Sequence, residues 1–151
     1  MDDKLKVLSK IARILNSRSI TWAVGASLLL YFKNSTDHFN DIDIMVSEND
    51  IEKAKEILLK VGELMPQSPN KQYKTRHFLE FVIDGVDVDV MAGFVIVKDG
   101  IDYECPFSQD QIAESIQVNG EDIPLQNLKD WRRYYELMGR ASKVKMIDRK
   151  D

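Results

Sequence analysis

The chain has 151 residues and a net charge of −4, and its 44% hydrophobic and 30% charged residues are typical of a globular protein with one core. No segment is long and apolar enough to span a membrane and the N-terminus has no apolar signal region, so we expect a cytoplasmic protein without a membrane partner. One cysteine excludes an internal disulfide, and one cysteine with two histidines is a poor supply of zinc ligands.

Helices and strands alternate in the first part of the chain. Apolar residues at helical spacing predict a first helix that ends near Ser17, and a buried strand follows at 20–24. A small-residue turn then leads into an apolar helix at 28–32. After a polar link, the strand 41–46 precedes a helix that we expect Asp50 to cap and a glycine to end.

Hairpins dominate the second part of the chain. A long polar loop at 63–72 contains two prolines, and Asp84-Gly85 and Lys98-Asp99-Gly100 are typical of hairpin turns. Strands are expected at 73–83, 86–90, 94–97 and 101–104. These elements predict an α/β (α+β) fold with a small mixed β-sheet flanked by helices, in a single domain over residues 1–151 with its core at about 20–105.

A short helical segment at about 126–147 is expected at the C-terminal end. Its aromatic residues, Trp131, Tyr134 and Tyr135, are interpreted as packing residues rather than as base-stacking residues. Residues 129–151 contain eight Lys and Arg against four acids, a local charge of +4 that leaves −8 for the remainder. This basic end could receive a phosphate-rich substrate, and a solvated helix face of mixed charge is the alternative interpretation.

Two Asp-x-Asp pairs, Asp41/Asp43 and Asp87/Asp89, lie inside short β-branched segments. Asp is depleted in strands, and residues i and i+2 of a strand point to the same face about 6.5 Å apart. Clustered carboxylates repel one another unless a cation compensates them, and hard cations such as Mg²⁺ prefer carboxylate oxygens. The pairs therefore predict a metal site, with a solvated acidic strand face as the alternative.

A possible phosphate cradle precedes the first acidic strand. Gly25 has no Cβ, so a phosphate could approach the backbone there, at the start of the following helix. The amides near Ala26 and Ser27 would open that helix, and Ser27 adds a hydroxyl donor. Taken alone, Gly25 is equally compatible with an ordinary turn.

The order of these motifs resembles that of the DNA polymerase beta-like nucleotidyltransferase superfamily. The resemblance covers residues 20–91, about half the chain, and rests on three motifs: Val24-Gly25-Ala26-Ser27, Asp41-Ile42-Asp43-Ile44 and Val86-Asp87-Val88-Asp89-Val90. Ala26 departs from the pattern, since many relatives have Gly or Ser there. Larger relatives also have a full substrate domain, so the acceptor pocket is expected to be small, shared between subunits of a homodimer, or completed by a partner protein.

The resemblance also implies the roles of individual residues. Gly25, Ala26 and Ser27 would hold the triphosphate of a nucleoside triphosphate (NTP) such as ATP, and Asp41 and Asp43 would bind two Mg²⁺ ions, which Mn²⁺ could replace. A third carboxylate, Asp89 with Asp87 as the alternative, would complete the metal site and accept the proton of the attacking hydroxyl. Other phosphate contacts are expected from the following residues only if the fold brings them to the cleft: Lys33, Arg132, Arg133 and His77.

The expected function is Mg²⁺-dependent transfer of a nucleoside monophosphate from an NTP to a hydroxyl acceptor. A small molecule such as an antibiotic is the acceptor considered first, and a protein side chain or an RNA end is less favoured. The alternative is a nucleotidyltransferase-like module with weak turnover that binds a nucleotide or a partner, for example within a toxin–antitoxin pair. The residues do not indicate the nucleotide base or the oligomeric state.

Overall fold

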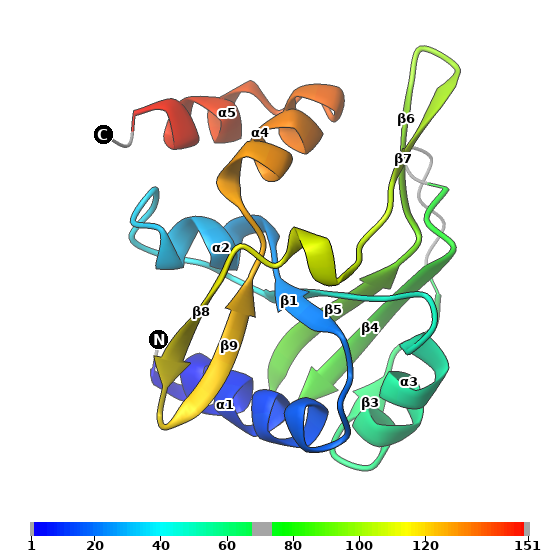
Figure 1. The fold of residues 1–151 in the computed structure, drawn as a ribbon, viewed down its shortest axis with the longest axis vertical. Coiled ribbons are helices and arrows are strands. Elements are labelled where there is room, and N and C mark those ends of the chain that lie inside the picture. The colour runs from blue at the N-terminus through cyan, green and yellow to red at the C-terminus, as the bar shows by residue number, and fades with distance from the viewer. Residues whose placement is uncertain (1, 68–73, 150–151) are drawn as a thin grey trace.

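The computed structural model describes residues 2–67 and 74–149 (Figure 1). Its helices are α1 (Asp2–Ser17), α2 (Ala26–Phe32), α3 (Ile51–Leu59), the 3₁₀ turn η1 (Gln109–Gln111), α4 (Leu128–Leu137) and α5 (Ala141–Asp148). Its strands are β1 (Trp22–Val24), β2 (Ile42–Val46), β3 (Glu63–Leu64), β4 (His77–Ile83), β5 (Val86–Ala92), β6 (Phe94–Lys98), β7 (Ile101–Cys105), β8 (Glu114–Val118) and β9 (Glu121–Leu125). Among the described residues, no helix is both long and apolar enough to cross a membrane.

The strands confirm the predicted mixed sheet. The main sheet has seven strands in the order β3-β4-β5-β2-β1-β9-β8, and β6 and β7 form a separate hairpin. Strand β2 runs antiparallel to β1 and parallel to β5, and β1 also runs parallel to β9. The sheet is therefore mixed, because crossover connections place parallel neighbours beside hairpin-connected antiparallel strands.

Local turn chemistry explains the hairpins that the sequence predicts. Asp84 and Gly85 both have positive φ, 50° and 79°, and join β4 to β5, while Asp99 and Gly100, at 51° and 75°, join β6 to β7. Positive φ at both central residues is the type I′ geometry whose twist matches that of the flanking strands. Part of the predicted loop 63–72, and Tyr73 at the start of the predicted strand 73–83, lie outside the described residues.

Two groups of helices cover the sheet (Figure 1). Helices α1 and α3 contact each other, and α1 packs on β9 with its buried residues Leu8, Ile11 and Leu15. On the other side, α2 contacts β2 and α4, and α5 packs on α4 at the end of the molecule far from α1. The aromatic residues of α4 are buried. Trp131 stacks on Phe94 of β6 and meets the rings of Tyr134 and Tyr135 in edge-to-face and tilted contacts, which confirms the interpretation of these residues as packing residues.

Several details differ from the sequence predictions, and one of them is that Glu63–Leu64, at the start of the predicted loop 63–72, forms strand β3 beside β4. The β8–β9 hairpin was not predicted, although Asn119 and Gly120 form its turn with φ of 50° and 82°. The C-terminal segment is two helices, because Gly139 has a φ of +74° that ends α4 before α5 begins. Asp50 is the N-cap residue of α3 as predicted, but its side chain makes no capping hydrogen bond and instead accepts one of 2.8 Å from the Thr21 amide.

Candidate functional site

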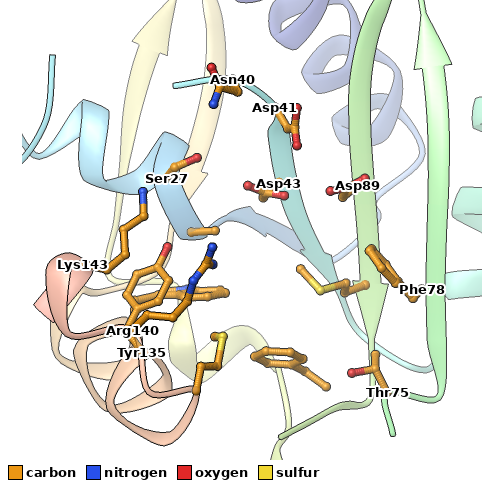
Figure 2. Close-up of a pocket in the computed structure, with 15 residues that line it drawn as sticks. Ser27, Asn40, Asp41, Asp43, Thr75, Phe78, Asp89, Tyr135, Arg140 and Lys143 are labelled. Carbon is orange, nitrogen blue, oxygen red and sulfur yellow. The ribbon is translucent and has the colours of Figure 1, made fainter. Parts of the chain in front are cut away.

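Two carboxylates meet at the centre of the main sheet. Strands β2 and β5 pair in parallel with Asp43 opposite Asp89, and both side chains point to the same face (Figure 2). Adjacent strands lie about 4.8 Å apart, so groups directly opposite each other on one face come within hydrogen-bonding reach. The two carboxyl groups are close enough that each shifts the pKa of the other. The register of this one pair of strands therefore builds the centre of the site.

Burial strongly affects the protonation of these two groups. Burial, and next the charges of Asp89 and Asp41, raises the pKa of Asp43 well above its ordinary value. Burial, and next the charges of Asp41 and Glu80, raises the pKa of Asp89 to about 6. Without a cation, the pair therefore retains a shared proton at pH values at which ordinary carboxylic acids have lost it. A positive ion bound there would replace that proton.

Asp41 and Asp87 flank this pair in different ways. Asp41 lies just before β2, is half-buried and borders the same cavity as Asp43 and Asp89. Burial, and next the charge of Asp87, raises the pKa of Asp41, and Lys4 opposes this shift. Asp87 is exposed and does not line the cavity. Of the two candidates for the third carboxylate, the structure brings Asp89 to the cavity beside Asp41 and Asp43.

The carboxylates form one wall of a cavity of ≈ 290 Å³ (Figure 2). The start of α2 contributes Ala26 and Ser27, and an apolar wall comes from β4, β5 and β6 through Phe78, Met91 and Phe94. The C-terminal helices supply the remaining side with these lining residues: Trp131, Tyr135, Met138, Arg140 and Lys143. The cavity thus combines an acidic wall, an apolar wall and a basic wall.

Gly25 is required by packing against α4. A Cβ at this position would lie 2.6 Å from Oε1 of Gln126 and 2.7 Å from Nε1 of Trp131, and these two groups are joined by a hydrogen bond of 2.8 Å. Gly25 itself does not line the cavity, whereas Ala26 and Ser27 do. Ala26 has a φ of +53°, a left-handed conformation that glycine adopts more easily than alanine. The role of Gly25, Ala26 and Ser27 as a phosphate cradle stays a prediction.

The donor set suits a cation that shares its coordination with a substrate. Within residues 2–67 and 74–149, no three His, Cys, Asp or Glu side chains are close enough together to hold a metal ion by themselves. Mg²⁺ usually retains several waters and takes one or two carboxylates together with substrate phosphates, so a complete protein cage is not required. Asp41, Asp43 and Asp89 supply the hard oxygen ligands that such an ion needs.

The predicted phosphate-binding cations lie elsewhere. Lys33 forms an ion pair with Glu114 at 2.8 Å, and Arg132 pairs with Asp148 at 2.7 Å on the outside of α4. Neither of them lines the cavity, and Arg133 and His77 do not line it either.

The basic residues at the cavity are Arg140 and Lys143, which the sequence analysis did not single out. Arg140 is the N-cap residue of α5 and Lys143 lies in its first turn, so both stand at the end of α5 that borders the cavity. The sequence signal that could have identified them is the helix boundary at Gly139 together with the basic C-terminal segment.

Comparison with known proteins shows the fold. No family model and no curated protein sequence matches the chain. The proposed nucleotidyltransferase TM1012 from Thermotoga maritima superposes with a TM-score of 0.75 at 24% identity, over 97% of this chain and 91% of TM1012. This chain has the nucleotidyltransferase fold.

Two antibiotic adenylyltransferases share this fold at lower sequence identity. ANT(2″)-Ia, in complex with adenylyl-2″-tobramycin, superposes with a TM-score of 0.64 at 12% identity, over 96% of this chain and 87% of its own. The lincosamide adenylyltransferase LnuA, bound to lincomycin, gives a TM-score of 0.62 at 12% identity, over 97% of each chain. The resemblance found from the sequence motifs is thereby confirmed at the level of the nucleotidyltransferase fold.

Proposed function

We propose that the protein is a metal-dependent nucleotidyltransferase that transfers a nucleoside monophosphate from an NTP to a hydroxyl group. The observation that carries the proposal is the register of Asp43 and Asp89 across β2 and β5, with Asp41 beside them in one cavity. In a chain with the nucleotidyltransferase fold, this arrangement agrees with the order of motifs in the sequence. Clustered carboxylates with raised pKa values are also more typical of functional sites than of ordinary strand surfaces.

Asp41 and Asp43 are the proposed ligands of both Mg²⁺ ions, and Asp89 is the proposed third ligand. The bound ions, for which Mn²⁺ is the alternative, would neutralise phosphate charge and make the acceptor hydroxyl more acidic. The fit rests on the donor set, since the three carboxylates border one cavity and a cation would offset their mutual repulsion. Ala26 and Ser27 border the cavity beside the carboxylates, where the phosphates would lie.

The proposed reaction is a displacement at the α-phosphorus. The acceptor oxygen forms a bond to this phosphorus, and the bond from the phosphorus to the oxygen that bridges to the next phosphate breaks. Pyrophosphate leaves with that electron pair, and the carboxylate of Asp89 takes the proton of the acceptor hydroxyl. The protein holds the reactants in line and excludes water with Phe78, Met91 and Phe94.

A small molecule is the proposed acceptor, and ATP is the NTP to test first. The wall that adjoins Asp89 is made of apolar side chains from β4, β5 and β6, which suits an apolar face on the acceptor or a nucleobase. Structures of the same fold contain adenylyl-2″-tobramycin or lincomycin, so antibiotics with a free hydroxyl form the first panel.

Calorimetric titration of each NTP with Mg²⁺ tests the site, and mass spectrometry of acceptor mixtures tests the transfer. Native protein should bind an NTP only when Mg²⁺ is present, and Asp41→Asn with Asp43→Asn should abolish this binding. Asp110→Asn, an exposed change on η1 away from the cavity, is the matched control.

Two outcomes would change the proposal. No NTP binding by the native chain at millimolar concentration would contradict it. Metal-dependent binding with no transfer to any acceptor would support the alternative, a nucleotide- or partner-binding module with weak turnover.

A further inference from the structure

Two cations from α5 face the three carboxylates across the cavity (Figure 2). The side chain of Lys143 extends toward Ser27, and the guanidinium of Arg140 points toward Asp43. Both cations interact electrostatically with Asp43, although neither forms a salt bridge with it. The acidic and basic walls are therefore separated by space that a ligand can occupy.

Arg140 and Lys143 are held in a way that leaves their charges directed at this space. Several other basic side chains form salt bridges, among them Lys10, Lys33, Lys74, Arg76 and Arg132. Within the part of the chain that the structure describes, no salt bridge joins Arg140 or Lys143 to a carboxylate. Arg140 instead lies over the ring of Tyr135 at 5.9 Å, a cation–π contact that orients the guanidinium without neutralising it.

Their place on α5 concentrates positive potential. Arg140 is the N-cap residue and Lys143 lies in the first turn, which contains no acidic residue. Cations are unfavourable at the positive end of a helix dipole, and Lys143 is half-buried beside a second cation. An anion bound between the two side chains would relieve both the mutual repulsion and the unfavourable interaction with the dipole.

We propose that Arg140 and Lys143 form a polyphosphate-binding subsite that holds the β- and γ-phosphates of the NTP. The inference rests on the proposed function for the identity of the nucleotide, and on the cavity geometry for the anion. The carboxylate wall attracts metal ions and repels phosphate, so the two outer phosphates, which carry most of the charge, lie against α5. The α-phosphate then lies between the walls, within reach of Asp41, Asp43 and Asp89.

The subsite would act on the leaving group as well as on binding. When the bond to the α-phosphorus breaks, its electron pair goes to the bridging oxygen, and pyrophosphate gains negative charge. Arg and Lys donate charge-assisted hydrogen bonds to phosphate oxygens, and such bonds strengthen as this charge develops. Loss of the two cations should therefore lower both the affinity for NTP and the rate of transfer.

Calorimetric titration with inorganic tripolyphosphate in the presence of Mg²⁺ tests the subsite without a nucleoside. Binding to the native protein is compared with binding to Arg140→Gln/Lys143→Gln and to Arg149→Gln, a control that removes an exposed cation just after the same helix. We expect the double variant to lose at least about 10-fold in affinity for tripolyphosphate and for MgATP, and to bind AMP as the native protein does. Lys143→Arg should preserve most of the affinity, because it retains the charge.

Three outcomes would overturn the inference: no binding of tripolyphosphate to the native protein, equal affinity in all variants, or an equal loss in Arg149→Gln. Thermal melting verifies that each variant is folded, and α5 has no buried residue whose loss would unfold the protein. The proposed function fails separately. The protein could bind tripolyphosphate through Arg140 and Lys143 yet show no Mg²⁺-dependent NTP binding and no transfer. That result would support the anion subsite and contradict the proposed transferase function.

Discussion

The acidic and basic walls of the cavity are built in opposite ways. The carboxylates lie on the central strands β2 and β5, where Ile42, Ile44, Val88 and Val90 alternate with them and are completely buried. The cations lie at the start of α5, with Arg140 as its N-cap residue and Lys143 in its first turn, and none of the eight residues of α5 is buried. The neighbours of Asp43 and Asp89 in the sheet hold these groups in place, whereas α5 packs on α4 through residues that are only half-buried.

The difference suits the two tasks proposed for the walls. Transfer at phosphorus needs reacting groups placed to within a fraction of an ångström, which a paired and buried strand provides. Neutralisation of phosphate charge tolerates small displacements, because Coulomb attraction changes gradually with distance. Substitutions on the acidic wall should therefore act mainly on the rate of transfer, whereas substitutions on the basic wall should lower both the affinity for NTP and the rate.

The largest expected effect distinguishes the two candidates for the third carboxylate. Asp89→Asn should lower the rate of nucleotide transfer by about 10³-fold, because it removes the group that accepts the proton. Asp87→Asn should change the rate only slightly, since Asp87 is exposed and outside the cavity. Steady-state kinetics of both variants with the same acceptor measures the contrast, and a greater loss in Asp87→Asn would reverse the assignment.

A packing substitution tests whether the α4 side of the cavity is as rigid as its burial indicates. Gly25→Ala should destabilise the protein by about 1–3 kcal/mol, because the new Cβ would overlap Gln126 and Trp131. Chemical denaturation gives the free energy of unfolding. Gly25 has an extended backbone with φ of −133°, which alanine adopts without strain. Gly100→Ala is the reverse control, in which the Cβ meets no neighbouring atom but φ is +75°. An unchanged free energy of unfolding in Gly25→Ala would show that Gln126 and Trp131 move aside for the new Cβ, so that packing does not require glycine at this position.

The pH dependence of stability reports on the carboxylate pair in the metal-free protein. The pKa values of Asp43 and Asp89 are raised in the folded state, Asp89 to about 6, so their contribution to stability is complete below pH 4. It is lost as the pH rises through the folded-state pKa values, because the folded protein then carries buried like charges.

Between pH 4 and pH 8, the free energy of unfolding of the native protein should fall by about 1–2 kcal/mol more than that of Asp43→Asn/Asp89→Asn. This figure allows for the partial exposure of Asp89. Denaturant titrations of both proteins in the presence of a chelator, at several pH values, measure this difference. Addition of Mg²⁺ at pH 8 should reduce it, and parallel pH profiles for the two proteins would contradict the shared proton.

The smallest expected effect concerns how α5 is anchored. Arg132 of α4 binds Asp148 of α5 through two hydrogen bonds of 2.7 and 2.9 Å, both at an exposed site. Asp148→Asn should leave the melting temperature nearly unchanged and should weaken tripolyphosphate binding by a few-fold, since α5 then positions Arg140 and Lys143 less firmly. Calorimetry measures the affinity, and an unchanged value would show that contacts with α4 other than this ion pair hold the basic wall.

Much of the fold was predicted from local patterns. The helices over Asp2–Ser17 and Ile51–Leu59 follow apolar residues at helical spacing, and the turns at Asp84-Gly85 and Asp99-Gly100 follow from residues that accept positive φ. The β8–β9 hairpin has a comparable signal in Asn119-Gly120. Its parallel pairing with β1, which widens the sheet beyond the predicted core at 20–105, joins residues about a hundred positions apart and has no local signal.

The sequence by itself determined which residues carry carboxylates on one face of β2 and β5, because side chains alternate along a strand and i, i+2 pairs share a face. Tertiary structure alone decided that Asp89 faces Asp43 and that Trp131 packs against Gly25. It also decided which cations border the cavity, namely Arg140 and Lys143 rather than Lys33 or Arg132. The physical reason is the distance along the chain over which each interaction acts. Backbone conformation responds to neighbours along the chain, whereas strand register and helix docking depend on the burial of surfaces that only the whole chain brings together.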